Sequence, residues 1–143
     1  MTGVLFCILA GAAMSFQGVI NTRLGERIGL YESNVFVQGT AFLLSLIALW
    51  LLGKGRLGEI VKMPWYLWMG GVLGLVITMT VMMGIKELSP TVAIATILIA
   101  QLLAAALIDA FGLIGTEKVP FAWNKYVGMA LLIGGVLLFK WKG

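Results

Sequence analysis

The sequence contains no histidine and a single cysteine, Cys7. One cysteine cannot form an internal disulfide, so cysteine usage says nothing about the redox compartment. No cluster of cysteines or carboxylates has the spacing of a metal site, and no nucleophile, base and orienting group occur together. The glycines also lack the lysine of an ATP-binding loop. We therefore expect no metal, no cofactor and no enzyme, and any energy for transport must come from a gradient.

Charge is also scarce: 11% of the 143 residues are charged and 61% are apolar, with a mean hydropathy of +1.05. Soluble domains carry about 25% charged residues. The composition therefore predicts an integral membrane protein with no room for a soluble domain. The net charge of +4 comes from residues expected at helix ends, where they meet lipid headgroups, so nucleic acid is not an expected partner.

Only three prolines occur, and each lies at the start of an apolar stretch or just before it. Spanning helices need about 17–25 apolar residues. Five stretches of this kind predict an all-α bundle of five transmembrane helices, forming one domain over residues 1–143. The stretches cover about 3–24, 33–52, 64–85, 90–115 and 121–139. The start lacks the basic region of a signal peptide, so we interpret the first stretch as a retained helix.

Local signals mark two of the helix starts. Ser33 is expected to cap the second helix, and Ser89 the fourth, with Pro90 at the first helical position. The fourth stretch carries one acid, Asp109, near its far end.

Small residues recur every four positions in two of the stretches and indicate close helix packing. They are Gly11, Ser15, Gly18 and Thr22 in the first stretch and Gly70, Gly74 and Thr78 in the third. In the fifth stretch, Gly128 and Gly135 lie seven apart on one face. Both internal packing and a subunit contact fit that face. We favour a dimer interface made by Gly128, Leu131, Leu132 and Gly135.

Lysine and arginine are divided equally between the two sides of the predicted bundle. The side of the N-terminus holds Lys54, Arg56, Lys62, Lys118 and Lys125, and the opposite side holds Arg23, Arg27, Lys86, Lys140 and Lys142. An excess on one side normally orients a small membrane protein. With no excess, two interpretations stay open. Either other cues or a partner protein fix the topology, or the chain inserts both ways and pairs as an antiparallel ten-helix homodimer, like transporters built from inverted repeats.

Four segments resemble a known family. They are AGAAMSFQGVINTRLGERIG, FVQGTAFL, AQLLAAALIDAFGLIG and YVGMALLIGGVLL, and they resemble the YdcZ-like branch of the drug/metabolite transporter superfamily along the whole chain. The matching positions are Gln17, Asn21, Gly25, Gly29, Gly39, Gln101, Asp109, Gly112 and Gly115. The resemblance implies a multi-pass protein of the bacterial inner (cytoplasmic) membrane, from a family that also contains gene pairs and fused ten-helix forms.

The chain is also distantly similar to the small multidrug resistance exporters. In those exporters a glycine heptad in the last helix forms the antiparallel dimer contact, which corresponds to Gly128 and Gly135 here. They also carry a glutamate in the first helix that couples drug to proton. This chain has Gln17 and Asn21 there, so the likeness does not extend to proton coupling through the first helix.

Polar residues inside the spans are the candidate site residues. Gln17 and Asn21 share a helical face, and so do Asn34 and Gln38. These amides either bond helices together or form the polar wall of a solute pocket. Asp109 is either hydrated or paired at the membrane interface, or it binds a cation or proton. The expected substrate-binding residues are Gln17, Asn21, Gln38, Gln101 and Asp109.

These observations predict a secondary transporter or exporter of a small organic solute. Gln17, Asn21 and Gln101 are expected to line a central cavity shared by two protomers, with Asp109 toward its mouths. The alternatives are a membrane scaffold or accessory subunit, in which polar residues only join helices, and a passive channel.

Overall fold

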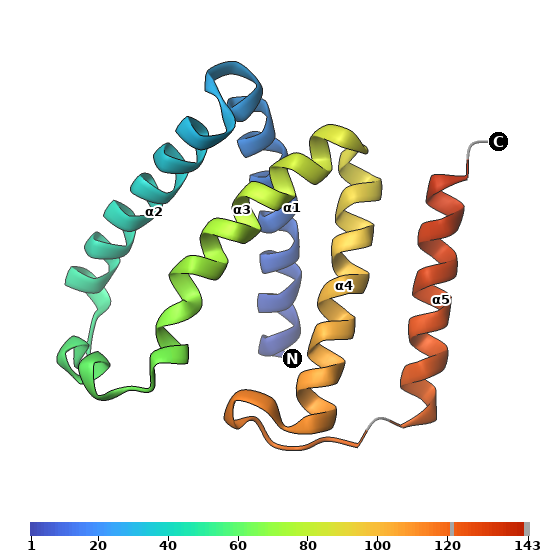
Figure 1. Ribbon diagram of the computed structural model, residues 1–143. Helices are drawn as coiled ribbons and strands as arrows, with labels where there is room; N and C mark the ends of the chain where they lie inside the picture. The colour runs from blue at the N-terminus through green and yellow to red at the C-terminus, as the bar shows by residue number, and fades with distance from the viewer. Residues whose placement is uncertain (121, 142–143) are drawn as a thin grey trace. The chain divides into compact units, whose positions relative to one another are not determined.

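The computed structural model describes residues 1–120 and 122–141, and within them it contains helices and loops but no strand (Figure 1). The α-helices are α1 (Thr2–Ile28), α2 (Leu30–Leu52), α3 (Gly70–Glu87), α4 (Pro90–Phe111) and α5 (Trp123–Lys140). The 3₁₀ helices are η1 (Leu57–Lys62), η2 (Trp65–Met69) and η3 (Leu113–Gly115). The all-α prediction is confirmed. The chain divides into two compact units, Met1–Lys86 and Glu87–Gly143.

Four helical segments among the described residues are long and apolar enough to cross a bilayer. They are α1, α2, the segment Trp65–Glu87 and α4, with 27, 23, 23 and 22 residues. At 1.5 Å per residue, even the shortest extends roughly 33 Å, enough for the hydrocarbon core. The 18-residue α5 carries Asn124, Lys125 and Lys140 near its ends and is not among the four. A fifth span therefore stays a prediction.

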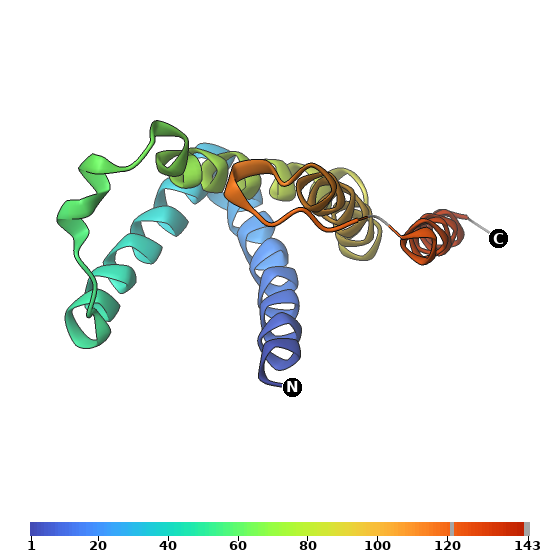
Figure 2. The same ribbon diagram turned by 90° about the horizontal axis from the view of Figure 1, so that it is seen from below.

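In the first unit, a single residue joins α1 to α2. Gly29 has φ 105° and ψ 152°, a conformation that is essentially restricted to glycine. Its N–H donates to the Gly25 carbonyl at 3.0 Å, and its carbonyl accepts from the Ser33 N–H at 3.0 Å. The chain thus leaves one helix and enters the next without a loop. Figures 1 and 2 show α1 and α2 diverging from this turn.

This turn corrects two predictions about helix ends. The first helix was expected to end near Leu24 but continues to Ile28, and the second begins at Leu30. Ser33 therefore lies inside α2 and does not cap it. The physical reason is that Gly29 can adopt a conformation from which α2 starts three residues before the expected serine cap.

Glycine packing in this unit is confined to part of each small-residue face. A Cβ on Gly18 would lie 2.8 Å from Ile85 Cδ1 and 3.1 Å from Val81 Cγ1, so α3 approaches α1 there. A Cβ on Gly11 would meet no atom within 4 Å. On α3, Gly74 lies near the Gln38 amide, whereas Gly70 has no such neighbour. Of the four glycines on these two faces, packing is confirmed for Gly18 and Gly74; the buried Thr22 and the half-buried Thr78 extend the packed part of each face.

In the second unit, α4 begins as the sequence predicts. The Ser89 side chain accepts from the Val92 N–H at 3.5 Å, and Pro90 is the first helical residue. The predicted end at Gly115 is wrong, because Gly112 takes a left-handed conformation (φ 63°, ψ 41°) that terminates the helix after Phe111. Glycine adopts this conformation without a steric penalty.

Two further boundaries differ from the prediction. The third stretch starts with η2, and α-helical geometry begins at Gly70 and continues to Glu87. The fifth helix runs from Trp123 to Lys140, and Phe121, where it was expected to begin, lies outside the described residues. Helices α4 and α5 lie side by side and antiparallel in both views (Figures 1 and 2).

Replacing Gly29 by alanine should destabilise the protein. A Cβ there would meet the Glu32 carboxylate, and the backbone conformation itself disfavours a side chain by about 1–3 kcal/mol. Denaturant unfolding in detergent micelles, followed by circular dichroism, measures the change. Gly39→Ala is the matched control in α2, because a Cβ at Gly39 meets nothing within 4 Å. Equal stability of the two variants would contradict the role assigned to the Gly29 turn.

Candidate functional site

Buried polar residues gather where α1, α2 and α3 meet in the first unit. Ser33 is fully buried, Asn34 is 3% exposed and Asn21 is 5% exposed. The Ser33 hydroxyl donates to the Asn21 backbone carbonyl at 3.3 Å and contacts the Met82 sulfur at 3.8 Å. A serine expected to be a helix cap is therefore a link between three helices.

Asn34 is the least satisfied member of this cluster. Its side-chain oxygen Oδ1 is buried and has no hydrogen-bond partner among the described residues. An amide oxygen buried without a partner costs about 1–3 kcal/mol. Such a group in a membrane protein is either a source of strain or a place where a water molecule or a polar ligand binds.

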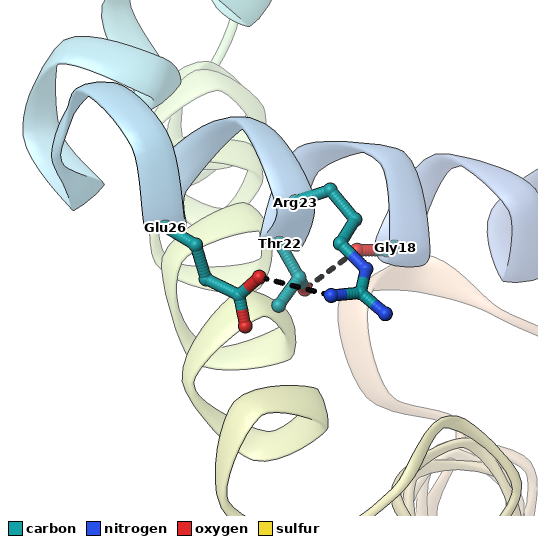
Figure 3. A network of polar contacts seen from close by, with 4 residues as sticks. All are labelled: Gly18, Thr22, Arg23 and Glu26. Atoms are coloured by element: carbon teal, nitrogen blue, oxygen red, sulfur yellow. Dashed lines mark hydrogen bonds and ion pairs between the residues drawn. The ribbon is translucent and has the colours of Figure 1, made fainter.

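Unlike Ser33, several hydroxyls in the spans donate within their own helices. Thr22 donates to the Gly18 carbonyl at 2.7 Å, as Figure 3 shows. Ser45 and Thr80 make the same bond to the carbonyl four residues earlier, at 2.8 Å each. Figure 3 also shows the exposed ion pair of Arg23 with Glu26, at 3.3 Å, one turn further along α1. Exposed pairs of this kind contribute little stability, so neither contact marks a binding site.

In the second predicted amide pair, Gln38 links α2 to α3. Gln38 is half-buried, and its Nε2 donates to the Thr78 hydroxyl at 3.5 Å. Thr78 in turn donates to the Gly74 carbonyl at 2.8 Å. This long bond joins the two helices, which is the interhelical role that amides take in membranes.

The two amides of the first predicted pair, Gln17 and Asn21, lie in different surroundings. Asn21 is buried, but Gln17, one turn earlier on α1, is exposed. The two amides share a helical face, yet α2 and α3 cover only its C-terminal part. Gln101, on α4 of the second unit, is also exposed. A cavity shared by Gln17, Asn21 and Gln101 stays a prediction.

A groove of about 650 Å³ runs between α4 and α5 in the second unit. Its walls include Leu102, Ala106 and Asp109 of α4 and Lys125, Gly128 and Leu132 of α5. Because the helices are antiparallel, Asp109 near the end of α4 and Lys125 near the start of α5 share one end of it. The opposite end, at Leu102 and Leu132, is apolar. The length from Leu102 to Asp109 is about 10 Å along the helix.

Neither charge in this groove is explained by helix stability. Asp109 lies in the last turn of α4, and Lys125 in the first turn of α5. A helix favours cations at its C-terminus and anions at its N-terminus, by about 0.3–1 kcal/mol each. Both residues therefore oppose the dipole of their own helix. Both residues line the same groove.

The chain after α4 folds back over the acid. The Val119 N–H donates to the backbone carbonyl of Asp109 at 2.9 Å. The Thr116 hydroxyl donates to the Ile108 carbonyl at 3.5 Å. The carbonyls at the end of α4 thus have partners within the loop, and the half-buried Asp109 side chain remains available to the groove.

Sequence reasoning separated residues that the structure brings together. Asp109 was assigned to a binding site, whereas Gly128, Leu131 and Leu132 were assigned to a dimer interface; all four line the groove. Gly135 is not among the lining residues. Lys125 had been interpreted only as a helix-end cation, and its position in the first turn, against the helix dipole, was the signal that could have identified it.

A family model described as "Putative inner membrane exporter, YdcZ" matches residues 2–138. No curated protein and no solved structure matches the chain. The family model covers both units and every candidate residue described above.

Asn34→Leu should leave the free energy of unfolding unchanged or raise it, because leucine has a similar size and removes a buried oxygen that has no partner. Ser33→Ala, the neighbouring control, should lower it by about 1 kcal/mol through loss of a hydrogen bond. Both are measured by denaturant unfolding in micelles. If Asn34→Leu is the more destabilising change, the amide oxygen is bound in the folded protein, and the cluster holds a water or ligand.

Proposed function

The chain belongs to the YdcZ family of inner-membrane exporters, and on that premise we propose that it is a secondary transporter that exports a small organic solute. It is a multi-pass inner-membrane protein. The family's described function is transport and not catalysis. Localisation and family membership identify neither the solute nor the working assembly, so both are proposed from the residues.

The observation that carries this proposal is the groove between α4 and α5. It combines apolar walls with a carboxylate and an ammonium group at one end. Ligand sites are typically apolar concavities with a few polar groups that orient the ligand. An ionisable residue within a span costs roughly 2.5–3.5 kcal/mol and usually marks a transport path. We propose that Asp109 orients the charged or polar end of the solute and that the alanine and leucine walls hold its body.

The amide cluster of the first unit supplies the second set of contacts in this proposal. Asn34 offers an oxygen without a partner, and Asn21 lies in the same cluster. Together with Gln17, Gln38 and Gln101, these amides would provide uncharged hydrogen-bonding positions along the path. Their number within otherwise apolar helices favours a carrier of a polar or partly polar molecule.

We further propose that the working unit is an antiparallel homodimer made by dual insertion. If α5 forms a fifth span, five cations lie on each side and supply no orientation signal. A Cβ on Gly128 or Gly135 would meet no atom within 4 Å, so this face of α5 is open to close approach by another helix. A partner's fifth helix on Gly128, Leu131 and Leu132 would also close the groove. The dimer contact and the substrate site would then share one surface.

The competing functions are a scaffold or accessory subunit and a passive channel. Flux in proteoliposomes separates them with a panel of small organic cations, anions and zwitterions. Uphill movement driven by an imposed gradient identifies a carrier. Downhill flux that does not saturate identifies a channel. Absence of flux across the panel, in protein shown to be folded, supports the scaffold.

Asp109→Asn should reduce solute flux about tenfold or more while the protein still folds. A hydrogen bond to a charged group contributes roughly 1.5–3 kcal/mol, and 1.4 kcal/mol corresponds to a factor of ten. Ala106→Trp should have a similar effect by filling the groove. Ala104→Trp is the control, because Ala104 is exposed on α4 and does not line the groove. Unchanged flux in Asp109→Asn and Ala106→Trp would remove the groove from the transport path.

Locking the orientation should abolish function if insertion is dual. Gly55→Lys with Gly58→Lys adds charge to one side at positions where a Cβ meets no neighbour. Glu87→Lys with Leu88→Lys adds it to the other side, at exposed residues. Each locked version alone should lose flux, and co-expression of the two should restore it. Full activity of one locked version by itself would show that dual topology is wrong.

A further inference from the structure

The linker between α2 and α3 must lie at the membrane surface. Helix α2 ends at Leu52, and the next spanning segment begins at Trp65, so the twelve intervening residues cannot leave the interface as a separate domain. The linker contains the 3₁₀ helix η1, and Figures 1 and 2 show the chain between α2 and α3 joining the ends of these two helices. Its side chains therefore meet the headgroup region on one face of the bilayer.

The linker has a defined structure. The Trp68 Nε1–H donates to the Ile60 carbonyl at 3.1 Å, which ties the start of the third span to η1. Within η1, the Lys62 ammonium group pairs with Glu59 at 3.1 Å. The Met63 N–H donates to the Ile60 carbonyl at 3.0 Å and closes the helix. These bonds hold the linker in one shape, so that it can present a binding surface.

That shape contains an apolar pocket. A cavity of about 410 Å³ lies between the last turn of α2 and η1. Leu49, Leu57, Ile60 and Met63 form its walls together with Gly55, and Arg56 and Glu59 border it. Beside it, Leu57 is 66% exposed, Val61 76% and Trp65 75%. Exposed apolar side chains beside the end of a span fit the boundary between lipid headgroups and acyl chains.

The linker that forms the pocket carries mostly positively charged side chains. The linker carries Lys54, Arg56 and Lys62 against one carboxylate, Glu59, and that carboxylate is paired with Lys62. Among the described residues, no ion pair joins Lys54 or Arg56 to an acid. Both side chains are exposed. Arginine binds phosphate through two parallel N–H donors, which gives it geometric preference for phosphodiesters.

We propose that this linker is a binding site for an anionic phospholipid. Lys54 and Arg56 bind the phosphate of the headgroup, and the pocket between Leu49 and Ile60 holds the upper part of an acyl chain. The combination of unpaired cations with an apolar pocket, at the depth where phosphate and acyl chain meet, favours lipid over a soluble anion. The site shares no residue with the buried amide cluster or with the groove between α4 and α5.

The test measures selectivity of the protein for spin-labelled phosphatidylglycerol over spin-labelled phosphatidylcholine, by electron paramagnetic resonance in mixed bilayers. Lys54→Gln with Arg56→Gln should lower the preference for phosphatidylglycerol by about fivefold for each cation removed. Lys86→Gln with Lys140→Gln removes the same charge from other helix ends and should leave it nearly unchanged. An equal loss in both double variants would show diffuse surface charge and overturn the site, as would wild-type protein without any preference.

Two further arms test the pocket and the nature of the ligand. Ile60→Trp fills the pocket without changing charge and should weaken the preference, whereas Val61→Trp, outside the pocket lining, should not. Equal behaviour of these two variants would contradict an acyl-chain pocket. Inorganic phosphate at millimolar concentration should not displace the labelled lipid; full displacement would identify a free-anion site and overturn the lipid proposal. None of these measurements depends on solute transport.

Discussion

The hydrocarbon core of the membrane contains no hydrogen-bond partners, and the other features of this protein depend on that constraint. Backbone groups meet it by forming helices. Hydroxyl groups meet it locally, as when Thr22 donates to the carbonyl four residues earlier. A side-chain amide carries two donors and an acceptor, which its own helix cannot satisfy. Another helix can satisfy such an amide, as α3 does for Gln38 through Thr78.

Polar groups whose position is not explained by helix stability are candidates for a functional role. The Asn34 oxygen is buried without a partner, although Ser33 beside it is linked to both neighbouring helices. In the second unit, Asp109 and Lys125 each oppose the dipole of their own helix and line one groove. Neither arrangement is explained by folding alone. Under the proposed export function, these groups would be contacts for the solute.

The groove also changes how the small residues of α5 are understood. Gly128, Leu131 and Leu132 form part of a concave surface that contains Asp109. Under the proposed antiparallel pairing, association and substrate binding would use the same side chains. A solute could then act on the stability of the dimer contact itself. The α2–α3 linker is different, because its cations Lys54 and Arg56 and its apolar pocket are proposed to bind lipid and not solute.

The sequence by itself determined the features that depend on solvent and on local chemistry. Its hydropathy identified a helical membrane protein, its motifs identified the family, and Ser89 with Pro90 marked the start of α4, because a cap involves only neighbouring residues. Only the tertiary structure decided the roles of Ser33, Asn34 and Lys125. Serine commonly caps helices, but the unusual backbone of Gly29 starts α2 earlier. Ser33 is therefore buried inside α2 and links it to the neighbouring helices. Burial of Asn34 and the placement of Asp109 and Lys125 along one groove depend on how separate helices pack, and the spacing of residues within one helix carries no information about that packing.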